Sequence, residues 1–222
     1  MGSYLNPGNK GFQESLNSEI YVDKTGLIEK TNEVLDTRQK FLCVSRPRRF
    51  GKSMAADMLA AYYERGEDSA ELFGTLKISK VESYEKNRNQ YDIIKVNMQE
   101  FLSMTHSMDE MLSMLQKYLI FDLTDHFDNV RFRDENNLIQ VMKDIYSKTK
   151  HSFVILIDEG LSVSGVSAGS GGTEEISGFP AGVAQGQRLC CTGLHDRYFT
   201  NKKIWFAFGI KYVYRIFHDG SR

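Results

Sequence analysis

Eight consecutive residues have the types and the order that could bind a chain of phosphates: Arg46-Pro47-Arg48-Arg49-Phe50-Gly51-Lys52-Ser53. Such a site needs backbone N–H groups from a tight loop at the start of a helix, a lysine for the outer phosphates and a hydroxyl for magnesium. Gly51, Lys52 and Ser53 fit the end of the pattern G-x-x-x-x-G-K-[ST], but Arg46 stands where that pattern has its first glycine. We predict that all eight residues bind the phosphates of a nucleotide, with Lys52 on the outer phosphates and Ser53 also on magnesium. The alternative is a turn that starts a helix and exposes a surface lysine.

Two carboxylates follow an apolar run later in the chain. Residues 153–157 are all apolar, and Asp158 and Glu159 come directly after them. In phosphoryl-transfer sites one carboxylate holds magnesium, directly or through water, and a second residue orients the attacking water. We therefore predict that Asp158 is a magnesium ligand and that Glu159 acts in catalysis together with Lys52. The alternative is that both carboxylates only cap the turn after a strand.

The three arginines of the loop could also serve another ligand. Arg46, Arg48 and Arg49 could neutralise phosphates or contact a nucleic-acid backbone. The whole chain has a formal net charge of -1, which gives no overall attraction to nucleic acid or to an anionic membrane. We favour contact with ATP phosphates, or an ion pair with a neighbouring acidic segment.

The elements that must position these residues alternate along the chain. Short apolar runs predict strands over 40–45, 91–96 and 152–157, and helical spacing of apolar residues predicts helices over 24–37, 53–65, 107–127 and 136–148. Ser107 and Glu110 form a capping-box pattern at the start of the third helix. Alternating strands and helices predict an α/β fold, a parallel sheet of the P-loop NTPase type flanked by helices on both faces.

Composition limits the chain to one globular core with at most a small appendage. It has 222 residues, of which 41% are hydrophobic. Its three cysteines and five histidines match neither a disulfide framework nor a zinc motif. This cysteine usage predicts a reducing, cytoplasmic location. No apolar run is long enough to span a bilayer, so we expect no membrane partner.

The loop from Ser45 to Ser53 resembles the hallmark loop of the bacterial AAA-ATPase-like family, whose members often carry a PD-(D/E)XK nuclease-like domain after the ATPase. Residues 21–28 resemble that family's N-terminal signature, and Ile157-Asp158-Glu159 resembles its magnesium motif; the resemblance covers residues 4–159. It implies that the cofactors are ATP and Mg²⁺ and that Arg46 is a family trait. Any nucleic-acid partner would be bound by a nuclease-like domain that this chain does not include.

The same resemblance divides the chain into three parts. Residues 1–39 are a family-specific segment, and residues 40–159 are the N-terminal part of an ATPase core. By analogy, Tyr21, Asp23 and Lys24 lie near the nucleotide; the alternative for these three is a structural clasp of the N-terminus. The third part, residues 160–222, has none of the features that the family places there.

After Glu159 the composition changes abruptly, since 11 of the 18 glycines lie at or after Gly160. The family would continue with a helix and a fourth strand that flanks the phosphate loop and leads into Thr-Gly-Ile-Leu-Pro. Reading each codon one base later from Gly160 permits such a continuation, including that pentapeptide. We therefore hypothesise a shifted frame just after the Glu159 codon, which makes residues 160–222 a non-native, disordered tail and leaves the sheet incomplete.

These features predict an ATP-binding and, by lineage, ATP-hydrolysing domain. Without its fourth strand, this chain should bind ATP weakly if at all and should not turn it over. One alternative is a non-catalytic, nucleotide-gated interaction module in which the two carboxylates only bind magnesium. Another is a P-loop phosphotransferase, which should have an arginine-rich lid downstream, and the tail offers no ordered candidate.

Overall fold

One four-stranded sheet forms the centre of the protein. The computed structural model describes residues 3–45, 50–160 and 203–208. In sequence order the strands are β1 (Phe41–Ser45), β2 (Asp92–Asn97), β3 (Phe153–Gly160) and β4 (Lys203–Phe208), and in space they follow the order β1-β4-β3-β2. β2 and β3 are parallel, whereas β4 is antiparallel to both of its neighbours. The three predicted strands and the α/β class are confirmed.

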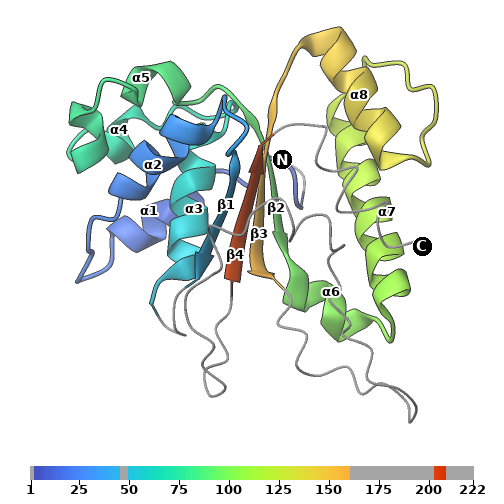
Figure 1. Ribbon diagram of the computed structural model, residues 1–222, viewed down its shortest axis with the longest axis horizontal. Coiled ribbons are helices and arrows are strands. Elements are labelled where there is room, and N and C mark those ends of the chain that lie inside the picture. Colours follow the sequence, from blue (N-terminus) through green and yellow to red (C-terminus); the bar gives the residue numbers. More distant parts are fainter. Residues whose placement is uncertain (1–2, 46–49, 161–202, 209–222) are drawn as a thin grey trace.

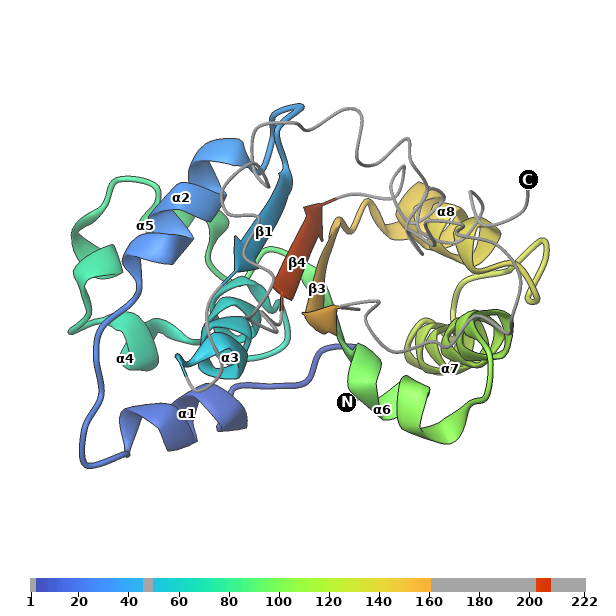
Figure 2. The ribbon, with the colours of Figure 1, turned by 60° about the horizontal axis from the view of Figure 1, so that its bottom comes forward.

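Helices cover both faces of the sheet (Figures 1 and 2). One face carries α1 (Lys10–Leu16), α2 (Gly26–Val34), α3 (Lys52–Tyr63), α4 (Ala70–Phe73), the 3-10 turn η1 (Lys77–Lys80) and α5 (Tyr84–Asn87). The other face carries α6 (Met98–Met104), α7 (Met108–His126) and α8 (Leu138–Thr149). Of the helices in the described ranges, none combines the length and apolar character that crossing a bilayer requires.

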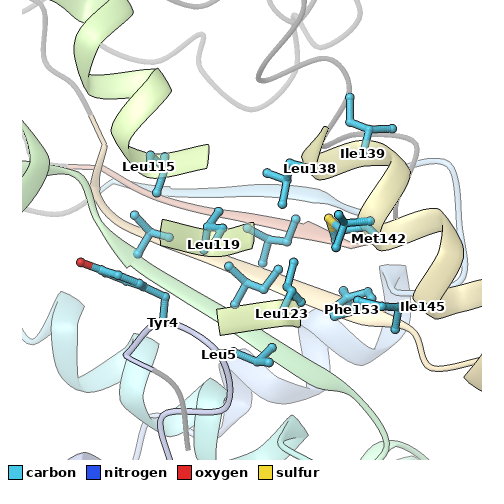
Figure 3. Close-up of a cluster of buried hydrophobic side chains, with 14 of the residues drawn as sticks. Tyr4, Leu5, Leu115, Leu119, Leu123, Leu138, Ile139, Met142, Ile145 and Phe153 are labelled. Atoms are coloured by element: carbon cyan, nitrogen blue, oxygen red, sulfur yellow. The ribbon is translucent and has the colours of Figure 1, made fainter. Parts of the chain in front are cut away.

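The strands have a hydrophobic core on each side. Phe153, Ile155 and Ile157 of β3 pack with residues of α6, α7 and α8, in the cluster that Figure 3 shows in part. Val154 and Leu156, which alternate with them, pack with α3 and its neighbours. Because both faces of β3 are buried, its sequence is a continuous apolar run rather than an alternating one.

Polar side chains fix where two of the long helices begin. Ser107 Oγ accepts a hydrogen bond from the Glu110 backbone N–H at 3.2 Å, as a capping box requires. The Glu110 carboxylate accepts from the His106 N–H at 2.8 Å, one residue earlier than the pattern predicts. At α8, Asn137 Oδ1 accepts from two backbone N–H groups of the first turn, each at 3.1 Å.

The first described residues pair with the outer edge of β2. Leu5 forms an antiparallel bridge with Ile94, and Tyr4 O accepts from the Lys95 N–H at 2.8 Å. The backbone N–H groups of Tyr4 and Leu5 also donate to Asp122 Oδ2 on α7, at 2.7 and 3.3 Å. An edge strand left open invites pairing with other chains, so this segment protects β2.

The place next to β1, where the sequence predicts a missing strand, is occupied in the structure. Lys203–Phe208 occupies it as β4, so for these six residues the structure differs from the expected disordered tail. The open edges of β1 and β3 offer backbone hydrogen-bonding groups, and Ile204, Trp205 and Phe206 are residue types with high strand propensity. The rest of residues 161–222 lies outside the described residues.

Candidate functional site

The sheet brings the two predicted segments to the same edge. β1 and β3 both run antiparallel to β4, so they point in the same direction, and Lys203 pairs with both Ser45 and Gly160 at their ends. The loop after β1 and the carboxylates at the end of β3 are therefore one strand apart. At the usual strand spacing this separates the two backbones by about 10 Å. An extended anion lying over this edge could contact both segments.

Asp158 and Glu159 stand where the β3–β4 pairing is irregular. The register between these strands shifts between Ile157 and Gly160. Such bulges change the direction of side chains at a strand end. Asp158 is 5% exposed and pairs in register with Asn97 at the end of β2. The side chain of Glu159 lies outside the described part of the structure.

Gly51 is the residue at which the loop becomes helix α3. Its backbone angles are φ 70° and ψ 37°, in the left-handed region, and its carbonyl accepts from the Ala55 N–H at 3.1 Å. A Cβ at this position would lie 3.0 Å from Lys24 Nζ. Glycine is thus favoured by the backbone conformation, whereas the tight space beside it is set by the flexible end of a lysine side chain.

Lys52 and Ser53 form the first turn of α3. Lys52 is 8% exposed, so the alternative of an ordinary surface lysine does not fit, while Ser53 is exposed. Phe50, just before the turn, is 56% exposed. Arg46, Pro47, Arg48 and Arg49 lie outside the described residues. The N-terminal dipole of this 12-residue helix favours an anion here, and Ser53 carries a hydroxyl oxygen of the kind that can bind magnesium.

The resemblance places Tyr21, Asp23 and Lys24 near the nucleotide, and the structure gives them different environments. Asp23 is a structural clasp, because its carboxylate accepts from the Thr25 N–H at 2.8 Å, the Thr25 hydroxyl at 2.6 Å and the Lys77 N–H at 2.9 Å. Burial acts to raise the pKa of Asp23, but these hydrogen bonds outweigh it and lower that pKa. Tyr21 packs edge-on against Phe12, and burial together with the Asp23 charge raises its pKa to about 12.

Lys24 contacts the described end of the loop. Its ammonium group donates to Phe50 O at 3.2 Å. Neither periodicity nor spacing in the sequence connects residue 24 with residue 50, and only the family resemblance brought Lys24 near the site. The contact extends the candidate site to the segment before α2.

The side chains that the structure describes do not by themselves make a complete metal site. Within the described ranges, no group of three or more His, Cys, Asp or Glu residues is placed to hold a metal ion. A magnesium ion held by Ser53 and Asp158 would therefore need further oxygen ligands from phosphates and water, as is usual for this ion.

No curated protein and no solved structure matches the chain. A family model described as a predicted AAA-ATPase matches residues 8–160, an interval that includes the loop, helix α3 and the carboxylates of β3. Because this match covers well over half of the 222 residues, the chain belongs to the AAA-ATPase-like family.

Proposed function

We propose that this chain binds ATP together with Mg²⁺ at the edge of the sheet where β1 and β3 end. The observation that carries the proposal is the placement of Gly51, Lys52 and Ser53 at the start of α3, one strand away from Asp158. This placement occurs in a member of the AAA-ATPase-like family.

Each residue has a distinct role in the proposal. The N–H groups at the start of α3 bind the phosphates, and Lys52 neutralises the outer ones. Ser53 and Asp158 hold magnesium, and Glu159 would orient the attacking water in the frame-restored protein. Arg46 to Arg49 add positive charge around the phosphates.

We further propose that turnover is lost in this chain because of a shifted reading frame after the Glu159 codon. The family match ends at residue 160, where the composition changes. The strand beside the loop is β4, which runs antiparallel to β1 and consists of Lys-Ile-Trp-Phe-Ala-Phe. It therefore does not supply the parallel fourth strand that the family resemblance predicts beside the loop. Sequencing the encoding DNA tests this: a frame restored at Gly160 that gives no open sequence with Thr-Gly-Ile-Leu-Pro refutes the shift.

Titration of the chain with Mg·ATP, followed by NMR, tests binding into the millimolar range. We expect binding that Lys52→Ala abolishes and that the matched control Lys30→Ala, on the exposed side of α2, leaves unchanged. Sustained magnesium-dependent phosphate release that Lys52→Ala abolishes would refute the loss of turnover. Absence of ATP binding by both this chain and the frame-restored protein would refute the proposed function itself.

Two other readings of the same site remain separable by experiment. A non-catalytic, nucleotide-gated module would bind ATP in the frame-restored protein without hydrolysing it. A phosphotransferase would consume ATP only when an acceptor molecule is present. Cytoplasmic location, and a nucleic-acid partner bound by a nuclease-like domain beyond this chain, remain proposals that rest on the family resemblance.

A further inference from the structure

Lys24 and the Phe50–Gly51 peptide form a contact that the proposed roles above do not use. Lys24 precedes α2, whereas the peptide precedes α3, and the contact spans 26 residues of sequence. Lys24 Nζ lies 3.2 Å from Phe50 O and 3.0 Å from the place where a Cβ of residue 51 would stand. The ammonium group therefore sits against the last peptide of the loop.

The backbone of Lys24 is held independently of the loop. Its carbonyl accepts from the Leu27 N–H at 3.0 Å in the first turn of α2. On one side of it, Asp23 accepts from the Lys77 N–H, and on the other, the buried Thr25 hydroxyl accepts from the Ile78 N–H at 3.2 Å. Lys24 thus extends from a segment fixed to η1, and it can impose an orientation on the loop.

Peptide geometry turns this contact into a constraint on an N–H group. In a planar trans peptide the C=O and the N–H point in opposite directions. Lys24 holds the C=O of Phe50, so the N–H of Gly51 must point to the opposite side of the peptide. The Ala55 N–H holds the Gly51 carbonyl at 3.1 Å, which fixes the following peptide as well.

We propose that Lys24 is a positioning residue that presents the Gly51 N–H to the phosphates before nucleotide binds. This inference rests on the proposed ATP site and adds a residue to it. An N–H oriented in advance binds an anion without the cost of ordering the loop. The ammonium charge also polarises the peptide that it contacts, which strengthens the opposite N–H as a donor.

The orientation can be measured without nucleotide. Residual dipolar couplings report the direction of the Gly51 N–H in the wild-type chain, in Lys24→Met and in Lys24→Arg. We expect Lys24→Met to change this coupling while the couplings of residues 54–62 in α3 stay the same. Lys24→Arg keeps a charged donor and should retain the wild-type value. An unchanged Gly51 coupling in Lys24→Met would overturn the inference, whatever the chain binds.

Nucleotide affinity gives the second measurement. A lost charge-assisted hydrogen bond in the loop should raise the dissociation constants of Mg·ATP and Mg·ADP by about tenfold and by the same factor, because Lys24 acts on the loop and not on the third phosphate. The dissociation constants of Lys24→Arg should stay within about threefold of wild type. As a control, Lys30→Met removes an exposed ammonium group that lies 2.9 Å from Glu33 on α2, and it should leave the dissociation constants unchanged.

The two failures are distinguishable. Wild-type affinity in Lys24→Met, alongside lost binding in Lys52→Ala, overturns the role of Lys24 and leaves the proposed ATP site standing. A loss confined to ATP, with ADP unaffected, also overturns it, because that result indicates direct contact with the third phosphate. Absence of nucleotide binding by the wild-type chain and by the frame-restored protein overturns the proposed function and this inference together.

Discussion

Glu64 makes the stability of the fold depend on pH in a direction opposite to that of most carboxylates. It lies at the end of α3, is 1% exposed and accepts a hydrogen bond from the Gly8 N–H at 2.7 Å. Burial raises its pKa from 4.5 to about 7, since the bond from Gly8 offsets only part of that effect and the charges of Glu67 and Asp92 add to it.

The sign of the pH dependence follows from proton binding. Between pH 4.5 and about pH 7, folded Glu64 keeps a proton that the unfolded chain has already released. Raising the pH through this range therefore lowers the free energy of unfolding. At 1.36 kcal/mol per pKa unit, this rise in the Glu64 pKa lowers the free energy of unfolding by roughly 3 kcal/mol, and the full loss is reached only above pH 7.

Glu64→Gln tests this, because the amide has a similar shape, keeps an acceptor for the Gly8 N–H and cannot ionise. Urea unfolding followed by circular dichroism should show the variant close to wild type at pH 5 and more stable by up to about 3 kcal/mol at pH 8. The control Glu82→Gln removes an exposed carboxylate and should give a small difference that does not grow between pH 5 and 8. A Glu64→Gln difference that stays constant over this range, or that grows toward low pH, would refute the reasoning.

Three further substitutions test other parts of the structure. Gly51→Ala should lower the free energy of unfolding by about 1 kcal/mol, because alanine is strained at φ 70°. It should also weaken Mg·ATP binding, because the new Cβ displaces Lys24 Nζ, and an unchanged affinity in calorimetry would contradict this. Asn137→Ala should cost about 1 kcal/mol in urea unfolding because α8 loses its cap, whereas the neighbouring Asn136→Ala should cost less than half as much. Asp122→Ala should lower the free energy of unfolding by roughly 2 kcal/mol and speed amide exchange at Leu5, since two buried N–H groups lose their acceptor; wild-type exchange rates would argue against this role of Asp122.

The main elements could be predicted from the sequence because their signals are local. The apolar run of β3 and the helical spacing of α3, α7 and α8 each lie within one window of the chain. The three helices begin and end within two residues of their predicted bounds, whereas β3 extends beyond its predicted end to Gly160. The start of α3 at Lys52 follows from the glycine just before it. α6 was missed because its seven residues are too few to show a periodic pattern.

The interactions that sequence reasoning did not predict connect distant segments. Nothing near Tyr4 indicates that it pairs with β2, since the partner strand is formed about 90 residues later. The contact of Lys24 with Phe50 is of the same kind. The motifs predict that Gly51, Lys52, Ser53 and Asp158 meet at one edge of the sheet, and their roles in binding stay a prediction. The nearness of Lys24 to this edge came from the family resemblance alone.

The pairing of the first residues with β2 and α7 has a consequence for the order of folding. Tyr4 leaves the ribosome 118 residues before Asp122, the acceptor of its N–H. During synthesis the bonds from the first segment to Asp122 must therefore wait until α7 has been made, and closing so long a loop is slow. Until then the first segment can pair with β2 but is not held there by Asp122, so this edge is most open to other strands before α7 emerges. A variant that weakens the bonds from the first segment to Asp122 should therefore reduce the yield of folded protein more than its effect on equilibrium stability suggests.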